Sequence, residues 1–364
     1  MDALTLWYTR CPAPTPLGIA AQLNWLEYEF ASDGIAVRSL QDVADPKLRQ
    51  SHQDHTLPNL FRQGGVVPAI YARSLGHATR VLGFTWTDEA QLLLARGDGP
   101  LLDPSGLRGK RLGVRVRSGA KIDAWRATTR RAYAAALKVA GLSERDVTFV
   151  EIPAPEQHDF SEVARHWPSV EPRELPEVRA LLAGEVDVIF HKGSRGVEVE
   201  RAIGARRIVD LGAHESSSVR SVGALRLLTA DADLIERHPR LVVRTLKLVL
   251  RAGEWAASHP FAAMSCVVSE TGSSELAVRS GYGNQVGEHL RTDFDARAIE
   301  ALDDCKSFLL AKGWLKSDFS LRDWLAPDPL AQAQQELSAQ RERTALGLSS
   351  VLGWSNAAPA FHPL

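Results

Sequence analysis

The first forty residues alternate between strand-like and helical patterns, and this order limits the folds that the chain can adopt. Residues 4–9 are apolar and rich in β-prone side chains, and residues 35–40 form a second run of this kind. Between them, residues 17–26 carry an apolar stripe with helical spacing. A strand, a helix and a strand in this order predict two parallel strands joined by a crossover helix, so we expect an α/β protein.

The junction between the first strand and its helix carries a cysteine among prolines. Cys11 follows the apolar run, and Pro12 and Pro14 prevent its continuation as regular strand or helix. Thr15 followed by Pro16 is typical of a helix N-cap with proline at the first helical position. A thiol near a helix N-terminus is favoured as a thiolate. Cys11 is therefore our first catalytic candidate, although a lone cysteine is more often a small buried apolar residue.

The strand and helix pattern restarts in the middle of the chain. Residues 111–116 predict a strand and residues 122–140 a long helix, and the alternation continues to about residue 212. We expect an inserted lobe II at residues 108–212, and a discontinuous lobe I formed by residues 1–107 and 213–364. Two crossing segments then predict a two-lobed α/β fold, in which ligands bind in the central cleft.

Composition and charge exclude several classes of protein. The chain has 43 Lys and Arg residues against 44 Asp and Glu residues, so no overall field attracts nucleic acid or an acidic membrane. No apolar run approaches the roughly 20 residues of a membrane span. Cys11, Cys266 and Cys305 are far apart and form no disulfide or metal pattern. The N-terminus lacks secretory features, so we expect a cytoplasmic protein and take it as a monomer.

A polar segment after the second strand carries further candidates. His52 is a suitable proton carrier to pair with a thiol. Arg62 can bind two oxygens of an anion with its forked guanidinium group. Gly64 and Gly65 allow backbone N–H groups to approach a ligand closely. A polar surface loop without a role is the alternative interpretation of the same residues.

The sequence indicates neither a metal nor an organic cofactor. His52 and His55 with Asp54 are a weak metal-ligand set, so we expect no metal. The GxGxxG, phosphate-binding loop, GxSxG and HExxH motifs are absent from the sequence. We therefore expect chemistry that side chains perform without a cofactor.

The inserted lobe offers candidates for the opposite wall of the cleft. Ser118 and Gly119 lie in a turn before a helix, which is a common seat for anions but equally common as a plain connection. Aromatic side chains for the pocket include Trp86, Trp125 and Trp167.

Segments across the chain resemble a known class of proteins. Residues 107–114, residues 182–187 and Pro239 with Trp255 are similar to the sulfonate, taurine and thiamine-precursor class of periplasmic substrate-binding proteins. This resemblance implies a two-lobed, type II periplasmic-binding-protein-like fold with a central ligand cleft. It says little about the ligand.

A narrower resemblance is to the aromatic sulfinate desulfinases of dibenzothiophene desulfurisation. The similar segments are residues 8–14, residues 52–68, residues 204–212, residues 308–310 and residues 324–327. The resemblance implies that Cys11 is the catalytic thiol, that His52 supports it, and that Arg62 and the Gly65 N–H bind the sulfinate. It also implies that the loops after the strands of the inserted lobe line the pocket. The substrate-contact candidates are accordingly Arg62, Gly64, Gly65, Ser118, Gly119 and His191.

These observations favour a desulfinase that needs no cofactor and uses a cysteine to cleave the C–S bond of an aromatic sulfinate, releasing sulfite. Its partner is a small anionic organosulfur substrate. The alternative is a solute-binding protein that delivers sulfonates or related ligands to an ABC permease. An enzyme of thiamine-pyrimidine synthesis shares the fold, but the cysteine-rich motif of that group is absent.

Overall fold

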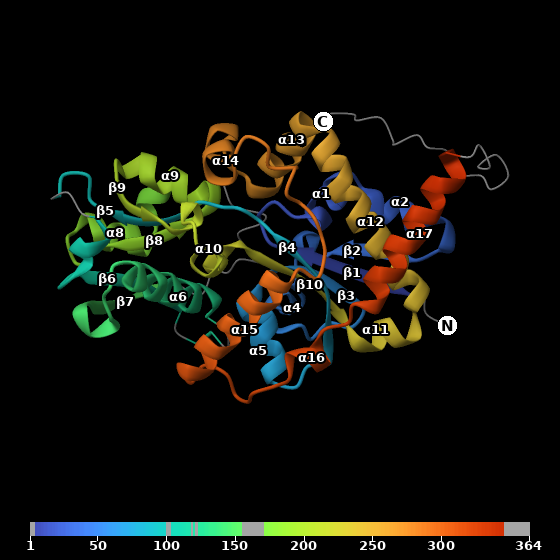
Figure 1. Ribbon diagram of the computed structural model, residues 1–364, viewed down its shortest axis with the longest axis horizontal. Coiled ribbons are helices and arrows are strands. Elements are labelled where there is room, and N and C mark those ends of the chain that lie inside the picture. The colour runs from blue at the N-terminus through green and yellow to red at the C-terminus, as the bar shows by residue number, and fades with distance from the viewer. Residues whose placement is uncertain (1–3, 100–102, 118, 121–122, 155–170, 346–364) are drawn as a thin grey trace.

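The computed structural model describes residues 4–99, 103–117, 119–120, 123–154 and 171–345. Its strands are β1 (Thr5–Arg10), β2 (Ala36–Ser39), β3 (Leu60–Gly65), β4 (Thr79–Trp86), β5 (Gln91–Ala95), β6 (Arg111–Arg117), β7 (Thr148–Ala154), β8 (Ile189–Lys192), β9 (Arg206–Asp210) and β10 (Leu225–Asp231). They form a five-stranded sheet of order β2-β1-β3-β10-β4, named the large sheet, and two small sheets of orders β8-β5-β9 and β6-β7. Figure 1 shows the large sheet and the small sheets in two separate halves of the molecule.

Helices cover the sheets on their outer faces. They are α1 (Pro16–Gln22), α2 (Trp25–Phe30), α3 (Pro46–Arg49), α4 (Ser51–Asp54), α5 (Val66–Ser74), α6 (Ala124–Val139), α8 (Pro176–Leu182), α9 (Gly193–Ile203), α10 (Ser217–Ala224), α11 (Ala232–Arg237), α12 (Pro239–Ser258), α13 (Pro260–Thr271), α14 (Glu275–Tyr282), α15 (Ala296–Ala311), α16 (Leu321–Trp324) and α17 (Asp328–Ala345). Within the described ranges, no helix is long and apolar enough to cross a membrane.

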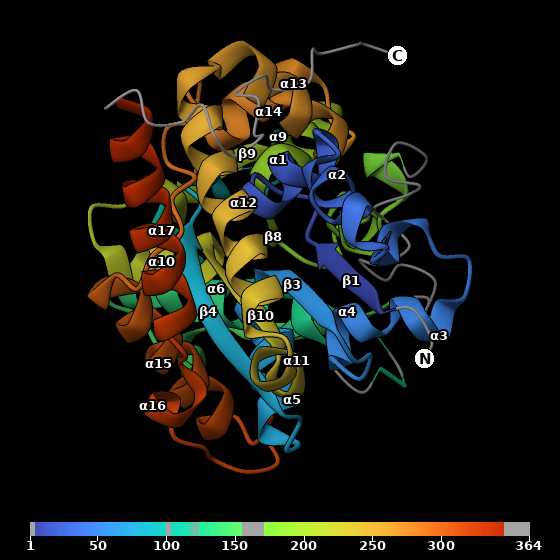
Figure 2. The ribbon, with the colours of Figure 1, turned by 90° about the vertical axis from the view of Figure 1, so that its right-hand side faces the viewer.

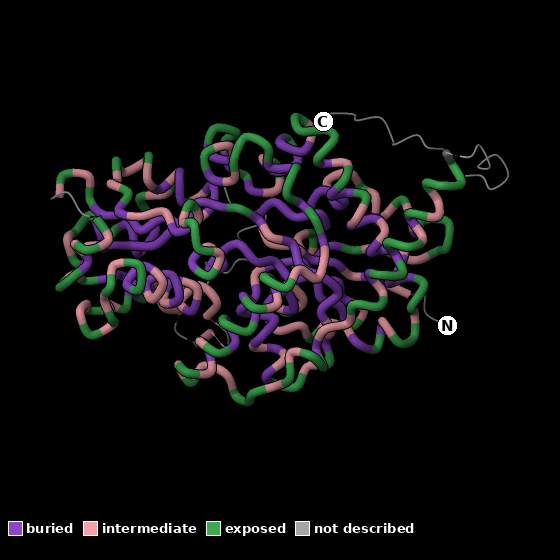
Figure 3. The backbone as a smooth tube through the Cα atoms, in the orientation of Figure 1, coloured by how far each residue is buried: buried purple, intermediate pink, exposed green. Residues whose placement is uncertain are grey.

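The large sheet has an apolar core on each face. Side chains of β10 alternate between the two cores, since Leu228 packs with α1 and α12 while Leu227 packs with α5 and α15. This alternation is the two-residue period of a strand buried on both faces. Figure 2 shows α1 and α12 close together along one side of the sheet, and Figure 3 shows that the buried backbone follows the strands.

The expected start of the fold is confirmed. β1 pairs in parallel with β2, and Thr15 caps α1 by accepting a hydrogen bond of 3.0 Å from the Gly18 N–H. Pro16 occupies the first turn of that helix. The helical pattern that the sequence predicts as one segment is divided at Asn24, whose φ of 55° separates α1 from α2. A left-handed residue cannot continue a right-handed helix.

The central strand β3 is absent from the sequence-based prediction. Its sequence is typical of a polar loop, because it contains Arg62, Gln63 and two glycines. In the structure it pairs with both β1 and β10. Gln63 is fully buried, where its side-chain oxygen accepts the Leu17 N–H at 2.8 Å and its amide donates to Thr85 at 3.0 Å. Burial of a polar side chain is tolerated when such partners are present.

The crossing between the two halves also differs from the expected boundary. β5 lies inside the expected lobe I range of 1–107, but it pairs with β8 and β9 in a small sheet. All five of its residues are buried, so this strand forms the middle of that sheet. The first crossing therefore lies at residues 87–90. Residues 346–364 of the expected lobe I range and the Trp167 candidate lie outside the described residues.

Candidate active site

The fold places Cys11 at the carboxyl end of β1, beside the end of β3. Its backbone N–H donates to the Gln63 carbonyl at 3.0 Å, which continues the parallel pairing of the two strands. Its Sγ accepts a hydrogen bond of 3.4 Å from the Gly65 N–H. Gly65 directly precedes α5, so the sulfur lies at a helix N-terminus, where the helix dipole favours negative charge.

His52 approaches the same sulfur from α4. Its Nε2 lies 3.6 Å from Cys11 Sγ, and its Nδ1 lies 2.9 Å from Thr9 Oγ1. The Gln41 amide donates to that hydroxyl at 3.1 Å, and the hydroxyl proton can then be donated to Nδ1. In this tautomer, Nε2 carries the proton that faces the sulfur. The ring is thus oriented by a third group, as in other pairs of nucleophile and base.

Arg62 lies next to the sulfur and is almost completely buried. Its Nε donates to the His52 carbonyl at 2.7 Å and its Nη1 to the Gly65 carbonyl at 3.1 Å. Its Nη2 is buried without a hydrogen-bond partner among the described residues. Burial lowers the pKa of Arg62, whereas negative charge at Cys11 acts against that shift. The guanidinium group is therefore fixed by two backbone carbonyls and retains one donor group for a ligand.

Gly64 is required where the sulfur and the guanidinium group meet. A Cβ atom at this position would lie 2.6 Å from Cys11 Sγ and 3.0 Å from Arg62 Nη2. A side chain at this position would displace one of these groups, so both border the space that Gly64 leaves open. Together with the Gly65 N–H, Nη2 forms a pair of donors suited to a two-oxygen anion.

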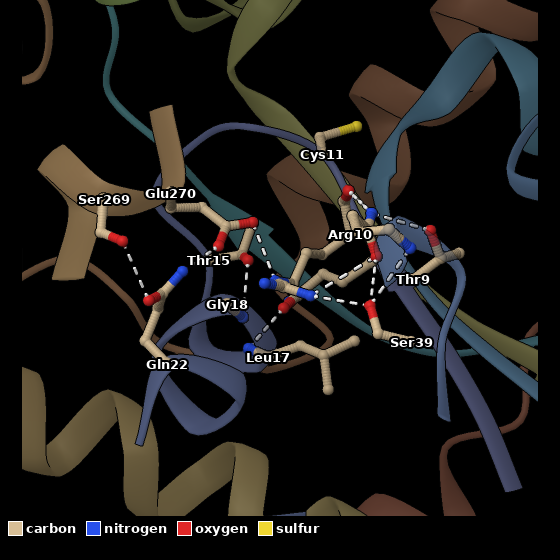
Figure 4. Close-up of polar contacts among 12 residues, drawn as sticks. Thr9, Arg10, Cys11, Thr15, Leu17, Gly18, Gln22, Ser39, Ser269 and Glu270 are labelled. Atoms are coloured by element: carbon tan, nitrogen blue, oxygen red, sulfur yellow. Dashed lines mark hydrogen bonds and ion pairs between the residues drawn. The ribbon is translucent and has the colours of Figure 1, made fainter. Parts of the chain in front are cut away.

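A cluster of polar side chains anchors the end of β1 on the side opposite to the Cys11 side chain (Figure 4). Arg10 forms an ion pair of 2.8 Å with Glu270 on α13 and donates to Ser39 at 3.2 Å. Gln41 donates to the Arg10 carbonyl at 2.7 Å. Figure 4 shows that the Cys11 side chain points away from this cluster. The backbone that carries the thiol is therefore held in place while the sulfur faces the cavity.

A cavity of about 160 Å³ separates the two halves of the molecule at this point. Cys11, His52, Arg62 and Gly65 line it from the large-sheet side. Its apolar lining is Pro12, Ala13, Val66, Val67, Pro68, Ala124, Leu175, Val222 and Leu225. Its charged lining is cationic in excess, with Arg62, Arg115, Lys192, Arg195 and Arg226 against Glu89. Such a cavity suits an anionic group attached to an apolar body.

His191 lines the opposite wall of the cavity. Its Nε2 lies 3.4 Å from Glu177, and its ring lies 5.9 Å from the ring of Trp125. Burial lowers the pKa of His191 to about 4; Glu177 opposes this shift, while Arg115 and Arg195 add to it. The imidazole is therefore neutral at pH 7.

This shift predicts a pH-dependent stability. The unfolded chain binds a proton at His191 near pH 6.5, but the folded chain does so only near pH 4. The unfolded state therefore holds more protons in this window, and the free energy of unfolding decreases by about 3 kcal/mol as the pH falls through it. The measurement is the free energy of unfolding in urea at several pH values. We expect it to depend less on pH between about pH 6.5 and pH 4 in His191→Gln than in the unaltered protein. The exposed His289→Gln is the control, and equal slopes in both variants would contradict the prediction.

The structure brings five of the predicted site residues to this cavity: Cys11, His52, Arg62, Gly65 and His191. Gly64 lies behind the sulfur. Gly119 is exposed and is not part of the cavity lining, and Ser118 lies outside the described residues. Trp125 lines the cavity, whereas Trp86 does not and bonds instead to Asp88. Within the described ranges, no group of three or more His, Cys, Asp or Glu side chains is placed to hold a metal ion.

Sequence reasoning missed four charged residues of the cavity: Glu89, Lys192, Arg195 and Arg226. A signal was present, because Arg226 interrupts an otherwise apolar strand run at residues 224–228. A charged side chain in such a run must find a buried partner or a ligand. The identity of that partner depends on the fold.

Comparison with known proteins adds to this geometry. No protein-family model matches the chain. Curated 2'-hydroxybiphenyl-2-sulfinate desulfinases from Rhodococcus erythropolis and Rhodococcus qingshengii are each 29% identical to it over 349 residues, which cover 89% of this chain and 92% of the relatives. The resemblance to the desulfinases is confirmed. Because it covers 89% of the chain, it extends over both halves of the molecule.

Solved structures agree with the desulfinase resemblance. The desulfurization enzyme DSZB, crystallised as a cysteine-to-serine mutant in complex with biphenyl-2-sulfinic acid, matches with a TM-score of 0.74 and 26% identity. The match covers 91% of this chain and 99% of that one. The aliphatic sulphonate-binding protein SsuA from Escherichia coli matches with a TM-score of 0.63 and 14% identity, over 90% of this chain and 92% of its own. The chain thus has the predicted periplasmic-binding-protein-like α/β fold.

Proposed function

We propose that this protein is a desulfinase that cleaves the C–S bond of an aromatic sulfinate with water. The overall reaction is R–SO₂⁻ + H₂O → R–H + HSO₃⁻, which needs no external oxidant or reductant. The observation that carries the proposal is the convergence of Cys11 Sγ, His52 Nε2, Arg62 Nη2 and the Gly65 N–H at one end of an anion-suited cavity. The similarity to curated desulfinases supports the same activity.

In the binding step, the sulfinate oxygens use two donors: Arg62 Nη2 has no partner among the described residues beforehand, and the Gly65 N–H gives up its contact with Cys11 Sγ. One oxygen accepts from Arg62 Nη2, and the other accepts from the Gly65 N–H. Hydrogen bonds between an ionised donor and an ionised acceptor are short and strong, particularly in a water-poor cavity. Because Arg62 is already held by two carbonyls, the substrate does not need to order it. The anion is thereby held against Cys11.

Two routes lead from this complex to the products, and Cys11 is central to both. As an acid, its thiol gives a proton to the ring carbon, the C–S electron pair becomes the new C–H bond, and the released SO₂ combines with water to form bisulfite. As a nucleophile, its thiolate bonds to the substrate sulfur while the carbon leaves with a proton, and water then cleaves the resulting S–S bond. In both routes, His52 carries the proton that restores the starting state.

The size and lining of the cavity support a compact aromatic group as the organic part of the substrate. A cavity of about 150 Å³ lined by apolar side chains holds benzene, and the present one has about 160 Å³. Trp125 and the apolar residues beside α5 provide surfaces for an aromatic ring. The proposed location is the cytoplasm, a reducing compartment in which a free thiol such as that of Cys11 persists.

A second candidate function is the binding of a sulfonate for import. The fold similarity to sulphonate-binding proteins favours this candidate, and a cationic cavity would suit a sulfonate as well. In a protein that only binds, Cys11 would be replaceable with little consequence.

One experiment separates the two functions. The purified protein is incubated with a panel of aromatic and alkyl sulfinates and the matching sulfonates, and sulfite release is measured beside binding by calorimetry. We expect sulfite release from aromatic sulfinates and none from sulfonates. Tight binding across the panel without sulfite release would contradict the desulfinase and support the binding protein.

Replacing Gly64 by alanine tests the geometry around the sulfur. The added Cβ would lie 2.6 Å from Cys11 Sγ, so the sulfur must move away from its donors. Because misplacement of a reacting atom by about 1 Å can cost about 10²-fold, we expect sulfite release to fall by about that factor. Gly113→Ala is the matched control, since its Cβ meets Ile152 at 2.9 Å in the small-sheet core. Both variants should lose stability, but a loss of activity in both would contradict the prediction.

A further inference from the structure

A cluster of buried charges lines the same cavity as Cys11 and has no role in the proposed reaction. Glu89 lies between two cations, with its Oε1 2.6 Å from Lys192 Nζ and its Oε2 2.9 Å from Arg226 Nη2. The side chains of Glu89 and Arg226 are 1% and 3% exposed, so both ions are removed from water. All three residues line the cavity. We name them the Glu89 cluster.

The cluster joins the two halves of the molecule at the cavity. Glu89 lies in the first crossing, between β4 and β5, and Lys192 ends β8 in a small sheet. Arg226 lies in β10 of the large sheet, directly opposite Gly65 in the antiparallel register. Arg226 is thus a strand neighbour of Gly65, which is proposed to bind the sulfinate. The Glu89 carboxylate connects it to Lys192 on the small-sheet wall.

The two cations of the cluster, Arg226 and Lys192, differ in how far the surrounding protein occupies their N–H donors. Arg226 donates to Glu89 and also to the carbonyls of Gly223 and Leu225. Its Nε has no hydrogen-bond partner among the described residues, but this atom is buried, so the guanidinium group is enclosed. Lys192 donates to Glu89 and, at 3.3 Å, to the Gly223 carbonyl. An ammonium group has three donors, and these two contacts leave it one more. The Lys192 side chain is 18% exposed, and its exposed part faces the cavity.

We propose that Lys192 is a second contact for the anionic sulfur group, supplied from the small-sheet wall and held over the cavity by Glu89 and Arg226. This role rests on the proposed desulfination. The sulfinate substrate has two oxygens, which Arg62 and Gly65 accommodate, whereas the bisulfite product has three. Lys192 binds the additional oxygen that water contributes. Glu89 and Arg226 are positioning residues, because they act through Lys192.

Electrostatics within the cluster agree with this role. Two cations and one carboxylate leave a net positive charge in a buried place, which is unfavourable until an anion enters. Burial and then Arg226 lower the pKa of Lys192, whereas Glu89 and negative charge at Cys11 act in the opposite direction. Burial also opposes the charge of Arg226, but Glu89 and Cys11 outweigh it and raise the pKa of Arg226. The cluster and Cys11 line the same cavity, so their charges act on each other.

The test uses alkylation of Cys11, which requires no turnover of a sulfinate. Rates are measured with neutral iodoacetamide and with anionic iodoacetate, and the modified peptide is identified by mass spectrometry. A cation facing the sulfur accelerates the anionic reagent relative to the neutral one. We expect Lys192→Met to lower the ratio of the two rates by about tenfold and Glu89→Gln to raise it. A merely structural role would change both rates together and leave the ratio unaltered.

A second measurement addresses the product directly. The sulfite concentration that halves the rate of Cys11 alkylation by iodoacetamide is expected to rise about tenfold in Lys192→Met. Lys306→Met is the matched control, because Lys306 is also largely buried and paired, at 2.9 Å with Asp318, but does not line the cavity. It should leave the ratio and the sulfite protection unchanged.

The outcomes separate this proposal from the proposed function. An unchanged rate ratio and unchanged sulfite protection in Lys192→Met would overturn the role of Lys192, even if the enzyme releases sulfite from sulfinates. Altered values in a protein that releases no sulfite would support an anion contact at Lys192 while contradicting the desulfinase. If Glu89→Gln does not fold, the Lys192→Met and Lys306→Met pair decides the question.

Discussion

Replacing Cys11 by serine is expected to lower sulfite release by about 10³-fold or more, with binding of the sulfinate retained. Serine has nearly the same shape, so Arg62 and the Gly65 N–H remain in place to hold the anion. Its hydroxyl is a much weaker acid and a much weaker nucleophile than a thiol, so both routes for C–S cleavage fail. The measurement is sulfite release at saturating sulfinate, beside calorimetric binding of the same compound.

Another cysteine of the chain provides the control for this variant. Cys266 is buried on α13, and burial raises the pKa of its thiol to about 11, so it remains protonated and unreactive. Cys266→Ser should therefore retain sulfite release, apart from a small loss of stability. Full activity in Cys11→Ser would contradict the proposed mechanism, and sulfinate binding without any sulfite release by the unaltered protein would favour a binding protein.

Arg62→Met is expected to have the second large effect, a decrease in kcat/KM of about 10²–10³-fold. The substitution removes the charged donor for the sulfinate and leaves two carbonyls, of His52 and Gly65, without their partner. Truncating one partner of a buried charged hydrogen bond costs about 2–5 kcal/mol, or about 30–5,000-fold, and the expected decrease lies within this range. The measurement combines steady-state sulfite release with thermal unfolding.

Two variants separate binding from folding in this experiment. Arg131 on α6 is also buried and donates to Ser221 at 3.1 Å, but it does not line the cavity. Arg131→Met should therefore lower stability with kcat/KM retained. Arg62→Lys keeps the charge but cannot reproduce the fork, and we expect it to recover only a small part of the activity. Equal activity of the lysine variant and the wild type would show that charge alone matters.

Local patterns in the sequence were sufficient for much of the fold. The apolar run at residues 4–9, the Thr15 and Pro16 pair and the second run at residues 35–40 predicted the parallel pair of β1 and β2, which the structure confirms. These signals are local because helix caps and apolar periodicity depend on neighbours within a few residues. The same locality placed Cys11 at the end of a strand.

Prediction was poorer where the burial of a residue depends on distant partners. β3 was not predicted, because Arg62 and Gln63 resemble surface residues until their partners from other segments are known. The pairing of β5 with β8 and β9 was likewise not encoded in its short apolar run, which is compatible with either half of the molecule.

The sequence by itself determined the α/β class, the position of Cys11 at a strand end and, through resemblance, the set of His52, Arg62 and Gly65. Tertiary structure alone decided that these groups face one cavity and that Glu89, Lys192 and Arg226 meet in its lining, between the two halves of the molecule. The physical reason is that Glu89 meets its two cations from positions 103 and 137 residues away. Contacts over such separations depend on how the sheets pack, and no local pattern specifies them.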